Sequence, residues 1–316
     1  MTELERPPSD AAWAAIRGAV DLHVHVGPDV IPRRVDDIDL AREFQRHRLG
    51  GFVIKSHYIP TAVQAATVTR VVSEVQVAGA ITLNHSVGGL NPAALEVAAR
   101  LGARVVWMPT VDAANEWTGR RPDTPAPAWG AFHEGLMARP GYPAPISLVD
   151  EGGRLTGAVE QCLEVVAAYD MVLATGHVGR DEIFALARRA REATVTSVLV
   201  THAEFPSVNL SPDDQVELVR LGAMVEHCYT TAFTGKTTWE AVFENLRATG
   251  PEGAVISTDL GQAANPPVAD GLADFADRLL AAGFTEDDVR TMAVVNPARL
   301  LGVAAPRTAA SRSPGG

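Results

Sequence analysis

The sequence predicts a (β/α)₈ barrel, and three observations carry this prediction. Eight short runs of β-branched residues recur along the 316 residues, stretches with helical periodicity separate them, and histidines stand at the ends of several runs. Alternating strands and helices are typical of a parallel sheet covered by its crossover helices. Eight such units in a row favour closure into a barrel, which commonly takes about 250 residues as one domain.

Each predicted strand is a β-branched run bounded by glycine or polar residues, as expected of a strand that is buried on both faces. The eight runs are residues 19–26, 51–57, 80–85, 104–110, 171–177, 196–202, 223–228 and 254–260.

Helical periodicity lies between these runs, at residues 35–48, 61–77, 92–101, 155–168, 180–192 and 212–221. Several of these stretches open with Ser, Asp, Asn or Pro and end near glycine, which are helix start and stop signals. An open doubly wound sheet is the alternative fold. Such a sheet usually carries a glycine-rich nucleotide loop after its first strand, and no such motif follows residues 19–26.

Two segments stand outside the strand and helix pattern. Residues 112–147, with Trp117, Arg120, Arg121 and Trp129, are Pro-rich and too long for a simple connection, so we expect a lid over the site. Residues 304–316 lack the apolar side chains that would offset the entropy of ordering, so we expect a disordered tail. The remaining chain, residues 1–303, is expected to form one domain.

The composition indicates a small-molecule protein. A formal net charge of −11 argues against a nucleic-acid or anionic-membrane partner, because both require an excess of Lys and Arg. No apolar run approaches the ~20 residues of a membrane span, and the acidic start MTELERPPSD does not resemble a signal peptide. Cys162 and Cys228 lie in apolar contexts, which favours buried free thiols and a cytoplasmic location. Whether the chain forms a homo-oligomer is left open.

The histidines carry the functional signal. Five of nine end a predicted strand, at positions 25, 57, 85, 177 and 202, and a sixth, His227, lies one residue before such an end. A barrel gathers the carboxyl ends of its strands on one face, where active sites of this fold are built. His23 and His25 share one face of their strand by its period of two. Barrel closure would bring Asp259, near the end of the last strand, beside them, where it could bind a metal or accept a proton.

The motifs DLHVH on the first strand, ATGH and LVTH on the fifth and sixth, and STDLG on the eighth resemble the amidohydrolase superfamily of metal-dependent hydrolases. The ending FTEDDVRTMAVVNPARLLGV, residues 284–303, resembles the closing helix of that superfamily, so the resemblance covers nearly the whole chain. It implies a site for one or two divalent ions, zinc first, with manganese or iron as alternatives. The metal ligands carried over are His23, His25, His177, His202 and Asp259, and Asp259 would also be the base that activates water.

One departure from the superfamily leaves the number of ions open. Binuclear members usually have a carboxylated Lys or a Glu at the end of the fourth strand, where this chain has MPTVD with only Asp112 nearby. Lys55, which shares a face with His57, could be carboxylated and bridge two ions, or be an ammonium that binds substrate. A mononuclear site, in which His202 is either catalytic or supports a metal ligand without binding the metal itself, is the remaining arrangement.

Further polar residues at or after strand ends could bind a carboxylate or phosphate of the substrate. They are His57, Tyr58, Arg33 and Arg180, together with Arg34, Asn84 and Lys236. Solvated surface cations are the alternative interpretation of the basic ones. His47, His85, His133 and His227 have structural interpretations of equal or greater weight.

The main functional prediction is hydrolysis of an amide, ester, lactone or related C–N bond, in which a metal lowers the pKa of water towards ~7 and polarises the scissile carbonyl. A metal-dependent decarboxylase or deaminase on the same barrel is the alternative, because a fold does not fix a reaction. A non-catalytic metal-binding or ligand-binding protein is the remaining class. The retained H-x-H pair and Asp259 argue against it.

Overall fold

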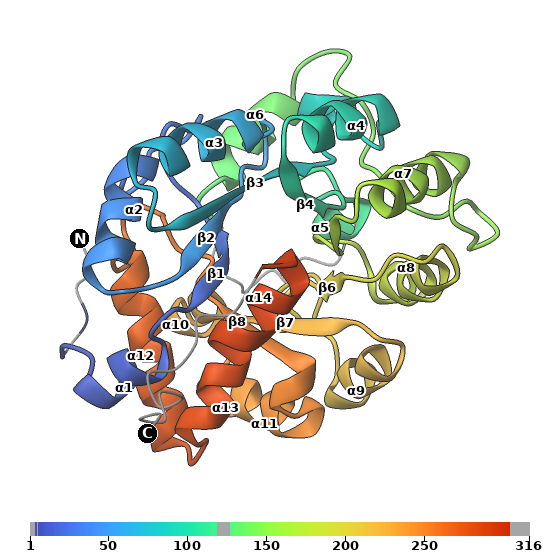
Figure 1. Ribbon diagram of the computed structural model, residues 1–316. Coiled ribbons are helices and arrows are strands. Elements are labelled where there is room, and N and C mark those ends of the chain that lie inside the picture. The colour runs from blue at the N-terminus through green and yellow to red at the C-terminus, as the bar shows by residue number, and fades with distance from the viewer. Residues whose placement is uncertain (1–3, 5, 119–126, 304–316) are drawn as a thin grey trace, which may run out of the picture.

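The computed structural model describes residues 4, 6–118 and 127–303, and its centre is a barrel of eight parallel strands (Figure 1). The strands pair in sequence order, each with the next along the chain. They are β1 (Val20–Val24), β2 (Gly51–Ile54), β3 (Gln76–Thr82), β4 (Ala103–Trp107), β5 (Val172–Ala174), β6 (Val198–Val200), β7 (Met224–Cys228) and β8 (Ala254–Ser257).

Closure of the barrel depends on contacts between β1 and the residues that follow β8. Val24 forms a parallel bridge with Leu260. The amide of Asp259 donates to the His23 carbonyl at 2.8 Å, and the amide of His25 donates to the Leu260 carbonyl at 2.8 Å. The predicted barrel is therefore confirmed, and its closure places Asp259 next to the two histidines of β1.

Helices surround the barrel and cover the outer face of its strands (Figure 1). The crossover helices are α2 (Asp37–Arg46), α3 (Ala62–Val71), α4 (Pro92–Arg100), α7 (Gly157–Ala168), α8 (Arg180–Glu192), α9 (Pro212–Arg220), α11 (Trp239–Thr249) and α12 (Val268–Ala281). The additional helices are α1 (Asp10–Ala15), α5 (Ala114–Thr118), α6 (Gly130–Met137), α10 (Tyr229–Phe233), α13 (Glu286–Arg290) and α14 (Asn296–Leu301).

Local signals in the sequence explain where several helices begin. The carboxylate of Asp36 accepts from the Asp39 amide at 2.8 Å before α2, and Ser211 caps α9 through the Asp214 amide at 3.1 Å. Asn91 caps α4 directly before a proline at its first position. These side chains satisfy amides that have no partner within a helix.

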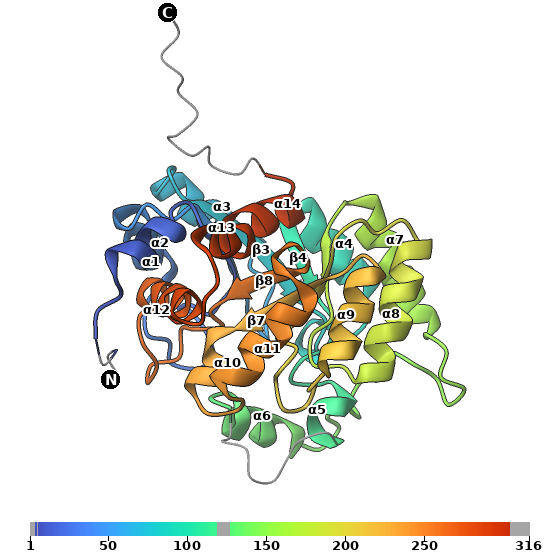
Figure 2. The same cartoon turned by 90° about the horizontal axis from the view of Figure 1, so that it is seen from below.

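The two ends of the barrel differ. Leu300 and Leu301 of α14 pack with inward residues of the strands such as Val20 and Trp107, and Arg104 at the start of β4 donates to the Leu301 carbonyl. This helix therefore covers the end where the strands begin. Figure 2 shows α5 and α6 at the opposite end, away from α13 and α14. The carboxyl ends of the strands, with their histidines, lie at that second end.

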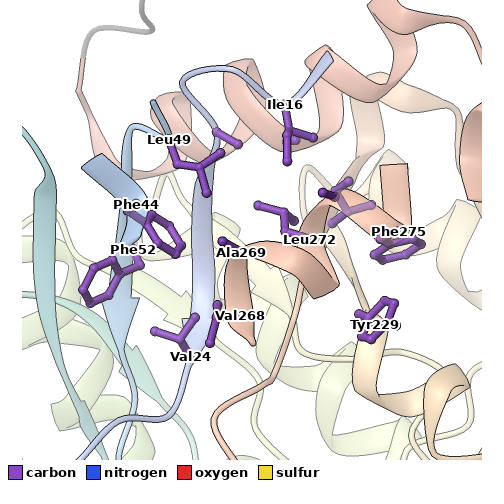
Figure 3. Packing of buried hydrophobic residues seen from close by; sticks show 14 of the residues in the cluster. Ile16, Val24, Phe44, Leu49, Phe52, Tyr229, Val268, Ala269, Leu272 and Phe275 are labelled. Carbon is purple, nitrogen blue, oxygen red and sulfur yellow. The ribbon is translucent and has the colours of Figure 1, made fainter. Parts of the chain in front are cut away.

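A second apolar layer fills the space between strands and helices. In Figure 3, Val24 and Phe52 on the strands pack towards Phe44 of α2 and the apolar face of α12, which includes Leu272. Each of these side chains is at most 1% exposed. Burial of one such side chain contributes about 1.5–3 kcal/mol relative to leaving it in water. This packing holds the strands of the site rigidly in register.

The predicted strands are all present, but several end earlier than expected. The predicted strands 51–57, 171–177 and 196–202 end at Ile54, Ala174 and Val200, so their terminal histidines lie in the following loops. After β2, the Ser56 hydroxyl accepts from the amides of Tyr58 and Ile59 and turns the chain. The predicted helix 61–77 is also too long, because α3 ends at Val71 and β3 begins at Gln76.

Some predictions fall partly or wholly outside the described residues. The expected tail, residues 304–316, lies outside them, as do Arg120 and Arg121 of the insertion. Cys162 and Cys228 are buried free thiols, as predicted. Among the described residues, no helix is both long and apolar enough to cross a membrane.

Candidate active site

A β-bulge in the first strand aims its two histidines. Val20 pairs with Gly51 and Val24 with Ile54, so β1 has one more residue than β2 over this stretch. The extra residue interrupts the alternation of side chains, and Leu22 packs in the barrel interior while Val24 packs against the helices. Bulges of this kind re-aim side chains near active sites. His23 and His25 both reach the carboxylate of Asp259.

Three ligating atoms from the two ends of the chain meet here. Asp259 Oδ1 lies 3.2 Å from His23 Nε2 and 3.1 Å from His25 Nε2. His23, His25 and Asp259 each offer one atom, and these atoms lie within 4.8 Å of one another. Burial alone would raise the pKa of Asp259, but His23, His25 and Lys55 hold this pKa well below its ordinary value. The carboxylate is therefore ionised.

Lys55 enters the same cluster from the loop after β2. Its Nζ lies 2.9 Å from His23 Nε2 and 5.4 Å from the centre of the Trp107 ring. Lys55 is 2% exposed, and burial lowers its pKa. The amine and the Asp259 carboxylate therefore contact the same nitrogen of His23, Nε2.

The opposite nitrogen of His23 is held by Glu226 on β7. Glu226 Oε2 lies 3.1 Å from His23 Nδ1 and also accepts the His202 amide at 3.2 Å. Burial would raise the pKa of Glu226, but the charge and hydrogen bond of His23 outweigh it and lower this pKa to about 2. An ionised carboxylate accepts a hydrogen bond from the protonated Nδ1, which leaves the lone pair of His23 on Nε2.

Five imidazole rings form a continuous group at the carboxyl ends of the strands. The ring centres are 5.8 Å apart for His23 and His202, 4.8 Å for His202 and His177, 6.0 Å for His177 and His57, and 5.1 Å for His57 and His25. Burial lowers the pKa of His25, His57, His177 and His202 well below the ordinary value. These four rings are therefore neutral, which is the form that ligates metals.

Two of these rings are oriented by neighbouring side chains. His177 Nδ1 lies 3.1 Å from Glu116 Oε2, and the Ser207 hydroxyl donates to the same oxygen at 2.6 Å. His57 Nδ1 lies 2.8 Å from the Thr110 hydroxyl. In both residues Nδ1 is engaged, so Nε2 is the nitrogen that remains for a ligand in the pocket.

Two residues of the site have a strained backbone. His202 has φ of 27° and Asp259 has φ of 52°, in the left-handed region that costs a non-glycine residue about 1–3 kcal/mol. Gly176, directly before His177, has φ of 65°, and a Cβ there would lie 2.3 Å from the Met108 carbonyl oxygen. The turn that presents His177 therefore requires glycine.

A pocket of about 250 Å³ opens over this cluster. His25, Lys55, His57, His177, His202 and Asp259 line its polar part, and Arg33 and Lys236 add two more cations. Trp129 and Phe205 are aromatic lining residues. The volume lies just below the ~300–1,000 Å³ of typical ligand sites, so a small molecule fits it.

The structure places two of the predicted substrate-binding residues away from the pocket. Arg180 lies on the surface, where its guanidinium pairs with Asp214 and Asp181. Tyr58 belongs to a buried apolar cluster with Ile31, Val111 and Trp129, so its ring packs against the insertion instead of lining the pocket. Neither side chain lines the pocket. Each residue does follow a strand end, but the loop directs its side chain away from the pocket, to the surface for Arg180 and into the apolar cluster for Tyr58.

The remaining predicted residues near the site are held by protein partners. Arg33 lines the pocket but pairs with Asp29 at 2.6 Å, and its Nη2 lies 3.4 Å from His25 Nδ1. Asp112, the acid nearest to the end of the fourth strand, accepts from His133 at 3.1 Å and from the Tyr142 hydroxyl at 2.9 Å. Asp112 therefore anchors the insertion, which removes it as a candidate for the bridging position.

Other residues singled out in the sequence have structural partners. His85 Nε2 lies 2.9 Å from the Ala144 carbonyl, and His47 stacks on Trp13 with ring centres 4.2 Å apart. His227 is buried and lies 2.7 Å from Glu204. Trp117 donates to the Val111 carbonyl at 2.8 Å.

Sequence reasoning missed the two carboxylates that orient the site histidines. Glu226 could have been found, because Met224 faces the barrel interior and the period of two puts Glu226 on the same face. A charged residue facing a barrel interior needs a partner. Glu116 had no comparable signal, since it belongs to a short helix within the Pro-rich insertion.

Comparisons with known proteins agree with this architecture. The chain is similar to an amidohydrolase from Pseudomonas aeruginosa, with 13% identity, a TM-score of 0.62, and coverage of 93% of this chain and 98% of that one. The probable dipeptidase PvdM from the same organism gives 11% identity, a TM-score of 0.59, and coverage of 92% and 98%. An organophosphorus hydrolase from Deinococcus radiodurans gives 14% identity, a TM-score of 0.53, and coverage of 94% of this chain and 99% of that one.

At these identities the likeness shows a shared fold. No curated protein matches the sequence. A family model described as a family of unknown function, DUF6282, matches residues 18–226, which is more than half of the chain. The chain therefore belongs to the DUF6282 family, and it shares its barrel fold with these three structures.

Proposed function

We propose that the chain is a divalent-metal-dependent hydrolase of small molecules, with the metal held by His23 Nε2, His25 Nε2 and Asp259. The observation that carries this proposal is the meeting of these three donors within 4.8 Å at the carboxyl ends of the strands. His25 and Asp259 also line the pocket, so a ligand can reach them. His177 and His202 line the same pocket as further ligands or as groups that contact the substrate.

The donor set fits such an ion. Two imidazoles and a carboxylate suit zinc, manganese or iron, and zinc is our first choice. A second group of potential ligands, formed by His23, Glu226 and Cys228, lies within the same distance limit. Glu226 and Cys228 are buried and do not line the pocket. We therefore assign the metal to the His25 side of His23 and an orienting role to Glu226.

A divalent ion at this position supplies Lewis-acid chemistry, which lowers the pKa of water and polarises a carbonyl or phosphoryl oxygen. The ionised Asp259 accepts a proton from the attacking water and returns it to the leaving group. His57 and Lys55 bind the polar part of the substrate. Trp129 and Phe205 exclude bulk water from the other side of the pocket.

Hydrolysis is favoured over decarboxylation or deamination by the similar structures, whose names are amidohydrolase, probable dipeptidase and organophosphorus hydrolase. We propose an amide, ester, lactone or related C–N bond as the bond that is cleaved. Analysis of the products separates the reactions, because hydrolysis of an ester, lactone or amide leaves a new carboxylate, a decarboxylase removes one as carbon dioxide, and a deaminase releases ammonia without forming a carboxylate.

Metal analysis of the purified full-length chain tests the proposal. The wild type is expected to carry about one to two equivalents of metal, and a chelator should abolish its hydrolysis of a panel of small esters, lactones and amides. The double variant His23→Ala/His25→Ala should lose both metal and activity. His47→Ala, which removes a histidine that stacks on Trp13 far from the site, is the matched control and should keep both. Hydrolysis that persists in metal-free protein would refute the mechanism.

A further inference from the structure

The charges that line the pocket are unbalanced. Arg33, Lys55 and Lys236 contribute three cationic side chains, of which Lys55 lies at the end of the pocket where the bond is cleaved, whereas Asp259 is the one acidic residue among the described residues that line it. A ligand with a negative charge would reduce this imbalance. The protein partners of each cation show which of them is available.

Two of the three cations are already engaged. The guanidinium of Arg33 makes two contacts with Asp29, at 2.6 and 2.8 Å, and both side chains are 2% exposed. Lys55 Nζ contacts His23 Nε2 and lies among the proposed metal ligands. Arg33 is therefore neutralised by Asp29, and Lys55 lies beside the bond to be cleaved, so neither is placed to bind a charged group at the other end of the substrate.

Lys236 is held differently. Its Nζ donates to the Thr234 hydroxyl at 2.7 Å, and within the described part of the chain it forms no ion pair with a carboxylate. Burial lowers the pKa of Lys236, although Asp259 and Glu116 oppose this effect through their charges. A partly buried ammonium whose one side-chain partner is a neutral hydroxyl gains from an anionic ligand more than an exposed one does.

The backbone holds Lys236 in a fixed place relative to Asp259. Lys236 follows α10, and its amide donates to the Thr231 carbonyl at 3.0 Å. The hydroxyl of Thr230, in the same helix, donates to the Asp259 carbonyl at 2.9 Å and to the Thr258 carbonyl at 2.8 Å. The segment that carries Lys236 is therefore tied to the loop that carries the proposed catalytic carboxylate.

We propose that the substrate carries a carboxylate that Lys236 binds, while the bond to be cleaved lies at Asp259. One ammonium matches a monoanionic carboxylate, whereas a phosphate dianion calls for more donors. The Thr234 hydroxyl accepts from Lys236 and donates to the Thr230 carbonyl, each at 2.7 Å, so it positions the ammonium. Between the two ends, Trp129 and Phe205 offer aromatic surface to a short apolar segment. The substrate class is thus a small carboxylic acid that also contains an amide, ester or lactone.

The reaction assigned to this substrate depends on the proposed hydrolytic function, but binding of the carboxylate does not. Binding is therefore measured directly by calorimetry, with phenylacetate and its neutral counterpart phenylacetamide as probes. The full-length protein is used as purified and again after dialysis against a chelator. A preference for phenylacetate that survives removal of metal comes from the protein's own cations, so failure of the metal mechanism would leave this test valid.

Wild type is expected to bind phenylacetate at least about tenfold more tightly than phenylacetamide, and Lys236→Met should abolish this preference through weaker binding of the anion alone. Lys236→Arg should retain part of it. The matched control Arg180→Met removes an exposed cation outside the pocket and should leave the preference unchanged. Equal binding of the two probes by the wild type, or an unchanged preference in Lys236→Met, would overturn the proposal.

Discussion

The substitution Glu226→Gln tests how the protein prepares His23 for a metal. Glu226 is fully buried, and one of its oxygens contacts both His23 Nδ1, at 3.1 Å, and the His202 amide, at 3.2 Å. Glutamine has nearly the same shape but no charge. The substitution therefore weakens two hydrogen bonds and leaves the packing of β7 intact.

The expected loss follows from these two contacts. A hydrogen bond to a charged group contributes about 1.5–3 kcal/mol and a neutral one about 0.5–1.5 kcal/mol, so each contact loses about 1 kcal/mol. Together they amount to ~2 kcal/mol, or roughly a 30-fold weaker metal affinity, since 1.4 kcal/mol corresponds to tenfold. Loss of a partner that orients a ligating histidine typically costs 10–100-fold, which agrees with this figure.

The assay is a competition titration of the metal-free protein with zinc in the presence of a chromogenic chelator. Glu204→Gln is the matched control, because Glu204 is also a buried carboxylate that contacts a histidine, His227 at 2.7 Å, but it does not touch the cluster of His23, His25 and Asp259. It should keep its zinc affinity while its free energy of unfolding falls. Equal zinc affinities for Glu226→Gln and wild type would refute the orienting role of Glu226.

Three further predictions address the backbone, the buried lysine and the insertion. Gly176→Ala should lower the free energy of unfolding in urea by at least ~2 kcal/mol, because the new Cβ would lie 2.3 Å from the Met108 carbonyl oxygen at a φ of 65°. Lys55→Met should keep or strengthen zinc binding while activity falls, because its Nζ now competes for His23 Nε2 at 2.9 Å. Burial raises the pKa of Asp112, but hydrogen bonds to its side chain outweigh this and lower the pKa overall. The hydrogen bonds of Asp112 should therefore stabilise the insertion above about pH 4, and this stabilisation should be lost as the pH falls further. Tryptophan fluorescence in an acid titration, compared with Asp112→Asn, measures that loss.

Each of these predictions has an outcome that would contradict it. Gly102→Ala is the control for Gly176→Ala, because it has a φ of 98° but nothing within 4 Å of the new Cβ, so it measures the conformational strain alone. If both variants lose the same free energy of unfolding, the close contact at Gly176 has no effect. A drop of about one metal equivalent in Lys55→Met, with bicarbonate speeding reconstitution of the wild type, would show a carboxylated bridging lysine instead. An acid transition that is identical in Asp112→Asn would assign it to other groups.

The strands and their order could be predicted because a strand that is buried on both faces leaves a strong local signal. Val53 and Ile54 are apolar whichever face they take, so the run around them is recognisable without its partners. Eight strand–helix units then indicated a closed barrel, and a closed barrel correctly predicted that Asp259 lies beside the first strand.

Features that depend on one residue of register or on a loop could not be read from the sequence. The bulge that turns His23 towards Asp259 exists only in relation to β2. Glu116 reaches His177 from an insertion whose path depends on tertiary contacts. For Arg180, in contrast, its position after a strand predicted a site residue. The structure places it at the start of α8, where its side chain lies on the surface and pairs with Asp214.

The most direct test of the central claim is the position of a metal in crystals of the full-length protein grown with zinc. Anomalous difference density measured at the zinc edge should have its strongest peak about 2.0–2.2 Å from His23 Nε2, His25 Nε2 and an oxygen of Asp259. Density between His23 Nδ1, Glu226 and Cys228, or no peak near His23 in crystals that contain zinc elsewhere, would contradict the account.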